Sequence, residues 1–438
     1  MTNKPFSVSA EELAQQIDRG LPDPLVSRRH LIYSSPATLA FNSPGAQGFG
    51  VKRAGLAIPG SVMLLVAPGC CGRNTTILSE LGGYKDRFFY LMMDETDIVT
   101  GRHLKKIPQA VCEVCDCLET RPSVVMICIT CVDALLGTDM ERMCRKAEEK
   151  AGLPVLPCYM YALTREGRKP PMVHVRQSIY SLLAPMKKKS TSVNLLGHFA
   201  PLIDDCELYP ILKSMGIRTI REISRCKSYG EYLSMAEANF NLVLDPEARM
   251  AAADLSKRLG IPYIELARLY HIDRIRKQYS LFAAALGLTI DDESYYLETK
   301  EAIEDFAGRH PGLTFSIGEG CNANAFELAA ALLDYGFGIA EIFKDPMPGD
   351  AVYIKRIAVA SPETRIYSNL EPTMLYYDIG SRTADIVIGK DAVYYHPGSV
   401  CLPWSDDIQP FGYAGVRCFF EACDKALADA EKGEGGLL

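Results

Sequence analysis

The chain has 438 residues, of which 48% are hydrophobic and 23% are charged, the balance of an ordinary globular protein; disordered and fibrous chains are excluded. Its net charge of −7 argues against a nucleic-acid-binding protein and against a basic membrane-surface protein. The longest apolar run, around 62–67, is far shorter than the roughly 18–20 residues that cross a bilayer, and residues 1–6 lack the pattern of a secretion signal. We therefore expect a soluble cytoplasmic protein.

The first part of the chain alternates short apolar runs with longer amphipathic ones. Strands are expected at 62–66, 87–93, 124–129 and 154–158, and helices at about 102–119 and 139–150. Such alternation is typical of βαβ units and predicts a parallel sheet. The lysine-rich segment 187–192 interrupts the pattern, and we interpret it as a linker.

Two further α/β series follow. Strands of the second are expected at 193–196, 217–220, 241–244 and 262–266, with helices at 272–286 and 297–308. The third has a strand at 313–317, a helix at about 324–335, further strands to about 395 that include Tyr376, Tyr377, Tyr394 and Tyr395, and a last helix at about 415–430. We predict an α/β protein of three Rossmann-like domains (1–190, 191–308 and 309–395) with parallel sheets around a central cleft. The C-terminal segment, 396–438, is expected to pack back on them.

The fifteen cysteines are unusual for a chain without an export signal. In a reducing compartment they are core residues, catalytic groups or metal ligands. Cys70 and Cys131 each follow a predicted strand, so their thiols can converge at the carboxyl edge of one sheet. Thiols there suit an iron–sulfur cluster, which normally takes four cysteines, so two facing chains would supply two each.

Other cysteines leave alternatives open. Cys71 is adjacent to Cys70 and is the alternative ligand, although successive side chains usually point apart. Cys112, Cys115 and Cys117 have the spacing of metal ligands, but the apolar residues around them repeat at helical spacing. A second metal site and plain helix packing both remain open for these three.

Several polar segments also have two interpretations. Gly318-Glu319-Gly320-Cys321-Asn322 follows a strand and opens a helix, where backbone amides can bind phosphate, but it lacks the third glycine of the dinucleotide motif. We expect a plain turn there. Asp94, Glu95 and Asp97 are interpreted as helix-capping or loop acids rather than proton donors. Structural or surface roles are expected for the isolated histidines, which are His174, His198, His271 and His396.

Four segments, taken in chain order, carry a family resemblance. They are Ser43-Pro44-Gly45-Ala46 with the strand that leads to Gly69-Cys70; Asp94-Glu95-Thr96-Asp97-Ile98-Val99-Thr100-Gly101; Thr130-Cys131 with Leu136-Gly137-Thr138-Asp139; and Pro410-Phe411-Gly412-Tyr413-Ala414-Gly415. In this order they resemble component 1 of nitrogenase and its relatives. Those relatives include the dark-operative protochlorophyllide reductases and the nickel-sirohydrochlorin reductive cyclases.

The resemblance implies a 4Fe-4S cluster shared between subunits and held by Cys70 and Cys131, with Cys71 as the alternative ligand. It implies an oxidoreductase subunit that receives low-potential electrons from an ATP-dependent reductase of the Fe-protein type. The partner must hydrolyse the ATP, because the chain has no Walker-type P-loop. A homodimer and a heteromer with a sister component 1 subunit both fit, and no catalytic residue is assigned.

Departures from the family pattern concern the substrate. Phe41 stands where many members have a further cysteine, so the eight-iron cluster of nitrogenase is not expected. Asp245 and Phe411-Gly412 stand where the catalytic subunit holds its iron–molybdenum cofactor with Cys and His. We therefore expect a substrate other than dinitrogen, such as a tetrapyrrole or a sulfur compound. A cofactor-maturation scaffold and a non-catalytic partner subunit are the alternatives.

A second metallocofactor or a bound tetrapyrrole also stays open. The cysteines that offer unusual ligands for it are Cys321, Cys401 and Cys418.

Overall fold

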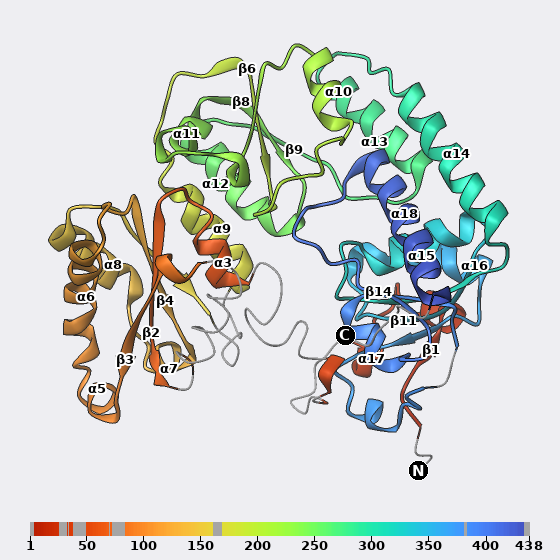
Figure 1. Ribbon diagram of the computed structural model, residues 1–438, viewed down its shortest axis with the longest axis horizontal. Coiled ribbons are helices and arrows are strands. Elements are labelled where there is room, and N and C mark those ends of the chain that lie inside the picture. The colour runs from red at the N-terminus through yellow and green to blue at the C-terminus, as the bar shows by residue number, and fades with distance from the viewer. Residues whose placement is uncertain are drawn as a thin grey trace. The chain divides into compact units, whose positions relative to one another are not determined.

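The computed structural model describes residues 4–25, 33, 35–37, 50–69, 71, 84–160, 169–380 and 383–432. Three sheets of largely parallel strands organise them (Figure 1). The chain forms two compact units, one of residues 43–201 and 216–267 and the other of residues 1–42, 202–215 and 268–438. The predicted α/β class with several parallel sheets is confirmed. The division into three domains and a C-terminal segment stays a prediction.

The first sheet has the order β3-β2-β4-β5. Its strands are β2 (Ser61–Pro68), β3 (Phe88–Met93), β4 (Val124–Ile129) and β5 (Val155–Tyr159), and its helices are α3 (Val51–Gly55), α5 (Glu95–Thr100), α6 (His103–Cys117), α7 (Cys131–Leu135), α8 (Met140–Ala151) and α9 (Pro171–Ser181). Helices α6 and α8 cover one face, and α3 and α9 the other (Figure 1). Every residue of β4 is therefore buried, which explains its unbroken apolar run.

The second sheet has the order β7-β6-β8-β9. Its strands are β6 (Lys189–Leu196), β7 (Thr219–Glu222), β8 (Ala238–Val243) and β9 (Tyr263–Glu265), with helices α11 (Tyr229–Leu233) and α12 (Arg249–Leu259). The linker predicted at 187–192 is wrong from Lys189 onward, because these residues begin β6. Lys189 and Ser190 are exposed, which explains the polar start of the strand, and Lys189 pairs with Glu237 at 2.7 Å.

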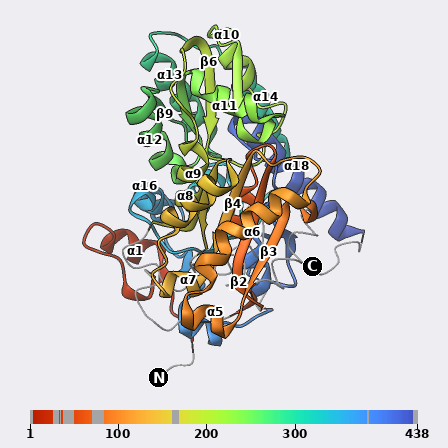
Figure 2. The same cartoon turned by 90° about the vertical axis from the view of Figure 1, so that its left-hand side faces the viewer.

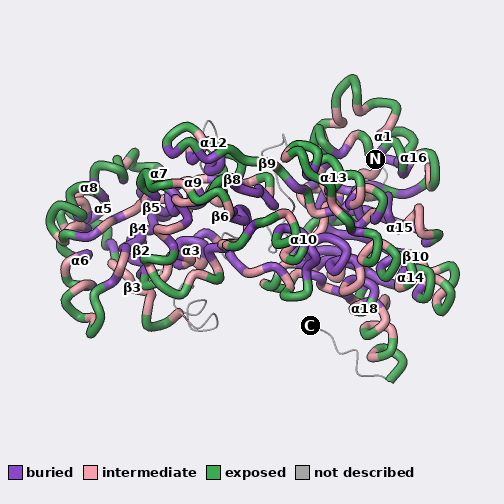
Figure 3. Tube along the Cα trace, turned by 90° about the horizontal axis from the view of Figure 1, so that it is seen from above, coloured by how far each residue is buried: buried purple, intermediate pink, exposed green. Residues whose placement is uncertain are grey.

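The third sheet has the order β1-β12-β11-β10-β13-β14. Its strands are β1 (Val8–Ser9), β10 (Thr314–Gly318), β11 (Gly338–Phe343), β12 (Arg365–Tyr367), β13 (Ile386–Ile388) and β14 (Val400–Leu402), and its unit holds helices α1 (Ala10–Gln16), α10 (Leu208–Ser214), α13 (Ile272–Ala285), α14 (Glu293–Arg309), α15 (Ala325–Asp334), α16 (Ala351–Ala360), α17 (Lys390–Tyr395) and α18 (Gly412–Glu431). Only β1 is antiparallel, and it closes the β12 edge. Figure 3 shows the central strands buried and much of the helix surface exposed.

None of the described helices has the length and apolarity needed to cross a membrane.

Two tyrosine pairs that were expected on strands lie on helical segments instead. The pairs are Tyr376 with Tyr377 and Tyr394 with Tyr395. The first lies at the end of a 3-10 helix, η7 (Pro372–Tyr376), and the second ends α17. The ring of Tyr395 stacks on Phe343 with a centroid separation of 4.6 Å. For Tyr377, Tyr394 and Tyr395 the strand prediction is wrong because aromatic packing in a buried cluster outweighs the strand propensity of tyrosine.

The C-terminal signature forms the start of α18, which begins at Gly412 rather than at the expected 415. Glu207 is fully buried there and accepts hydrogen bonds from the backbone N–H groups of Tyr413 (2.7 Å) and Ala414 (3.0 Å) and from the hydroxyl of Tyr279 (2.6 Å). Gly412 has a φ of +63°, and a Cβ at this position would overlap Oε1 of Glu207. The glycine is therefore required by the cap of α18.

Candidate metal centre

Cys131 is the first residue of α7 and lies two residues after the end of β4, at the carboxyl end of the first sheet. Its side chain is partly buried, and its Sγ lies 4.0 Å from the carbonyl oxygen of Met160. Figures 1 and 2 both show α5 and α7 at this same end of the sheet. The structure thus puts a thiol at the sheet edge where ligands of parallel sheets gather.

The other predicted ligands are only partly within the described residues. Cys70 and the segment 43–46 lie outside them. Cys71 is described and is partly buried, and it packs against the core beside α3 and α9. The Cys71 thiol therefore has the surroundings of a packing residue.

The acidic signature caps a helix, as interpreted from the sequence. Asp94 is the N-cap of α5 and forms a capping box with Asp97, while Glu95 is exposed. The carboxylate of Asp97 also lies 2.7 Å from Lys106 Nζ and 2.6 Å from Arg102 Nε. The hydrogen bond from Lys106, and to a lesser extent the one from Arg102, holds the pKa of Asp97 well below its ordinary value. Asp97 is thus ionised, and its carboxylate caps α5 and pairs with Lys106 and Arg102.

A buried histidine and aspartate connect this signature to the segment that carries Cys131. His103 Nε2 lies 3.1 Å from Oδ1 of Asp133, and the hydroxyl of Thr138 donates to the same oxygen at 3.1 Å. His103 Nδ1 lies 3.0 Å from the backbone carbonyl of Asp97. Burial raises the pKa of Asp133, against the opposing effects of His103 and Thr138. Sequence reasoning missed this pair because thirty positions separate its members.

Four apolar side chains at this end of the sheet are strongly exposed; we refer to them as the α5–α7 patch. They are Met92 (61% exposed), Val99 (84%), Leu135 (70%) and Leu136 (46%). They come from the end of β3, from α5 and from α7 with the residue after it. Exposed apolar side chains at one end of a sheet are candidates for an interaction surface.

The three cysteines of α6 behave as helix residues. Cys115 packs against the core, Cys117 is exposed, and the Cys117 thiol donates to the carbonyl of Val114 at 3.3 Å. Within the described part of the chain, no three His, Cys, Asp or Glu side chains are grouped to hold a metal ion. The contact of Cys115 with the core and the hydrogen bond of Cys117 within the helix favour helix packing for Cys112, Cys115 and Cys117. Cys321, Cys401 and Cys418 are partly buried, and a role for them as ligands stays a prediction.

The turn after β10 is occupied by the protein's own carboxylate. Asp391 is fully buried and accepts hydrogen bonds from the backbone N–H groups of Glu319 and Gly320 and from the amide of Asn369, each at 2.8 Å. A Cβ added at Gly318 would overlap this carboxylate. The amides that were considered for phosphate binding therefore already hold an anion, in agreement with the expected plain turn.

At two positions where the catalytic subunits of nitrogenase hold their cofactor, this chain has residues that cap a helix or pack in the interior. Asp245 accepts a hydrogen bond from the N–H of Glu247 at 2.8 Å and caps the short helix η5 (Pro246–Ala248), and Arg176 lies 3.8 Å away. Phe411 is buried next to the Gly412 cap. Neither position offers a thiol or an imidazole, so these residues do not fit an iron–molybdenum cofactor held in that way.

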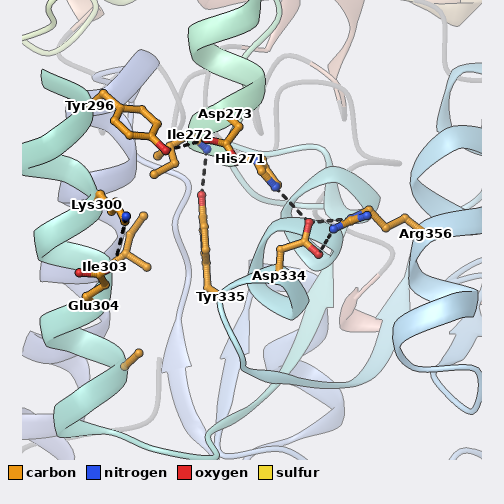
Figure 4. A pocket seen from close by; sticks show the side chains of 11 residues that line it. His271, Ile272, Asp273, Tyr296, Lys300, Ile303, Glu304, Asp334, Tyr335 and Arg356 are labelled. Carbon is orange, nitrogen blue, oxygen red and sulfur yellow. Dashed lines mark hydrogen bonds and ion pairs between the residues drawn. The ribbon is translucent and has the colours of Figure 1, made fainter. Parts of the chain in front are cut away.

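A cavity of about 520 Å³ lies between the helices of the other unit, lined by residues of α14, α15 and α16 and by the start of α13 (Figure 4). Its charged side chains pair within the wall. Asp334 is bound by both Arg356 and His271 (3.1 Å to His271), and Lys300 lies 3.8 Å from Glu304. Because these charges compensate one another, the wall indicates no particular class of ligand.

The fold and the site together define a multidomain α/β protein with a cysteine at the carboxyl edge of a parallel sheet. The family model described as nitrogenase component 1 type oxidoreductase matches residues 46–428, and the chain belongs to this family. The resemblance read from the four signature segments is thus confirmed.

Individual relatives agree with this assignment. The nitrogenase iron-molybdenum cofactor biosynthesis protein NifE of Sinorhizobium fredii is 24% identical over 356 residues, covering 76% of this chain and 71% of the relative. NifE of Rhizobium meliloti is 24% identical over 341 residues, covering 74% and 70%. The solved structure of nitrogenase Cp1 at pH 6.5 aligns over 94% of this chain and 97% of its own, with a TM-score of 0.71 and 16% identity, and shares the fold.

Proposed function

We propose that this chain is a component 1-type subunit that contributes Cys70 and Cys131 to a 4Fe-4S cluster shared with a second subunit. The observation that carries the proposal is the Cys131 thiol at the sheet edge, beside the exposed α5–α7 patch. A cluster takes four thiolates, and two chains facing each other through this patch would supply them. Cys70 is the preferred second ligand because Cys71 packs against the core.

Such a cluster supplies one-electron transfer at low potential when it is bound. The chain's own residues hold the thiolates and set the charge around them, with Asp133 anchored by His103 two residues after Cys131. The electrons come, in this proposal, from an ATP-dependent reductase of the Fe-protein type. Because the thiols must stay reduced, we propose the cytoplasm as its location.

The proposed substrate is not dinitrogen. Asp245 caps η5, and Glu207 closes the α18 terminus at Gly412, so both positions are engaged in structure. An organic substrate such as a tetrapyrrole or a sulfur compound agrees better with this arrangement. We assign no catalytic residue.

A maturation scaffold is the second candidate function. It is favoured by the relatives from Sinorhizobium fredii and Rhizobium meliloti, which are cofactor biosynthesis proteins. A scaffold holds a metal cofactor precursor without turnover, and it too can carry an interface cluster.

The first test is the iron and acid-labile sulfide content of anaerobically purified protein, with an EPR spectrum after reduction. We expect about two irons per chain, since four irons would be shared by two chains. Cys70→Ala and Cys131→Ala should each lose this iron while circular dichroism shows the fold retained. Cys117→Ala is the matched control, because Cys117 is an exposed thiol on α6, and it should keep the iron. Full iron content in both cysteine variants would disprove the ligand assignment.

A second measurement separates the relay from the scaffold. With an Fe-protein-type reductase and ATP, a relay subunit should show cluster reduction that stops when ATP is withheld. A scaffold should instead contain many more than two irons per chain, and it should release them to an acceptor protein without any substrate being reduced.

A further inference from the structure

We propose that His103 is a positioning residue for the thiol of Cys131. The inference rests on the proposed function in one respect, namely that Cys131 is a ligand. Helix α7 has only five residues, Cys131–Leu135, so its own hydrogen bonds cannot keep it folded. Something outside α7 must therefore set the direction of its first side chain.

Asp133 is the anchor of α7, two residues after Cys131. Its side chain is fully buried, its Oδ1 receives the hydroxyl of Thr138 at 3.1 Å, and its backbone carbonyl receives the N–H of Thr138 at 3.1 Å. These two bonds close the turn after α7 on itself. They do not connect α7 to the rest of the unit.

His103 makes that connection. It is the first residue of α6, a fifteen-residue helix packed against the core, and only 2% of it is exposed. Its Nε2 lies 3.1 Å from Asp133 Oδ1, and its Nδ1 faces the carbonyl of Asp97 at 3.0 Å. A carbonyl only accepts, so Nδ1 donates to it, and this bond fixes the plane of the ring. The long helix thereby holds the short one through a buried polar contact, in addition to the packing of Val132 against the core.

The two ring nitrogens can be tested separately. The amide nitrogen of glutamine reaches the position of Nε2, and that of asparagine reaches the position of Nδ1. His103→Gln therefore retains the contact with Asp133, whereas His103→Asn retains only the contact with the Asp97 carbonyl. Both replacements are polar and smaller than or similar to histidine, so they form a matched pair.

The direct readout is the alkylation rate of Cys131 in full-length protein from which iron has been removed by chelation, followed by peptide mass spectrometry. Exposed Cys117 in the same molecule is the internal reference. We expect His103→Asn to raise the Cys131 rate relative to Cys117 by about threefold to tenfold, the effect of losing one buried polar contact. His103→Gln should stay close to the wild-type rate.

The second readout is the EPR spectrum of the reduced, iron-containing protein. A displaced thiolate should broaden the signal and shift its g values in His103→Asn, with the wild-type spectrum retained in His103→Gln. The control is His271→Asn, which breaks a His–Asp contact of the same length, 3.1 Å to Asp334, in the other unit. It should change neither readout.

Equal alkylation rates in His103→Asn and wild type would overturn the proposal, and so would equal acceleration in the Asn and Gln variants. The alkylation measurement needs no bound iron. If wild-type protein binds no iron, the proposed function fails, while the Asn and Gln variants still decide whether His103 positions the Cys131 thiol.

Discussion

At the level of single residues, Asp391 takes the place that a phosphate occupies in a nucleotide-binding turn. Its carboxylate is held by the N–H groups of Glu319 and Gly320, and the Gly318 and Gly389 backbones leave room for it. The glycine pattern after a strand is the same whether the anion is a ligand or a side chain 71 residues away. For this reason the sequence left both interpretations open.

Asp391→Ala should destabilise the protein by about 2–4 kcal/mol, because it removes the shared acceptor of three hydrogen bonds at a largely buried site. The measurement is urea unfolding followed by circular dichroism. Asp18→Ala is the control, since Asp18 forms only an exposed ion pair with Lys355 and its loss should cost about 0–1 kcal/mol. Equal midpoints for the two variants would contradict the assigned role of Asp391.

Glu327 should make stability depend on pH. It is 2% exposed and accepts the N–H groups of Tyr270 (2.9 Å) and His271 (3.2 Å), and burial raises its pKa from 4.5 to about 7. The folded state therefore binds the proton more tightly than the unfolded state, and stability is lost as the pH rises from 4.5 to about 7.

Glu327→Gln carries no charge and should lack this dependence. Between about pH 5 and about pH 7 the wild type should lose stability relative to the variant by about 1 kcal/mol per pH unit, and the difference should stay constant at higher pH. Urea midpoints of both proteins at several pH values measure the difference. Parallel curves for the two proteins would show that Glu327 titrates normally.

At the level of elements, the start of α18 depends on one glycine. Gly412→Ala should be strongly destabilising, by about 3 kcal/mol or more, because its Cβ would overlap Glu207 and its φ is +63°. Gly308→Ala is the matched control, since Gly308 lies inside α14 with no atom within 4 Å of the added Cβ. It should be neutral or stabilising by up to about 1 kcal/mol. Thermal unfolding of the two variants tests the contrast.

The elements at the carboxyl edge of the first sheet are joined by side chains rather than by sequence proximity. Asp97 after β3, His103 on α6 and Asp133 on α7 form one chain of contacts. Each residue lies in or beside a segment that resembled the family. The sequence predicted the segments separately, and only the fold shows that their side chains contact one another.

At the level of the whole molecule, the α5–α7 patch should determine whether two subunits associate. Leu135→Glu and Val99→Glu place charges on side chains that are 70% and 84% exposed, so folding should be unaffected while a subunit interface is weakened. We expect a shift toward monomer by analytical ultracentrifugation. Val359→Glu, at an 87% exposed position on α16, is the control and should leave the mass unchanged. An unchanged mass in the patch variants would mean that association uses another surface.

Much of the fold followed from local pattern. The unbroken apolar run of β4 and the alternation of strands and helices are local properties, and they predicted β2 to β5 within one or two residues. The strand prediction for Tyr395 failed because an aromatic cluster, built from distant parts of the chain, outweighs propensity. The linker prediction failed at Lys189 because an exposed strand end has the same composition as a loop.

The sequence by itself determined the class of fold, the family, and Cys131 as a thiol just beyond the end of a strand. Each depends on residue types and spacings along the chain. Only the tertiary structure decided that Asp391 fills the turn after β10, that Glu207 closes the start of α18, and that His103 reaches Asp133. The physical reason is that a buried polar group must find a partner, and where it finds one depends on which segments the fold brings together.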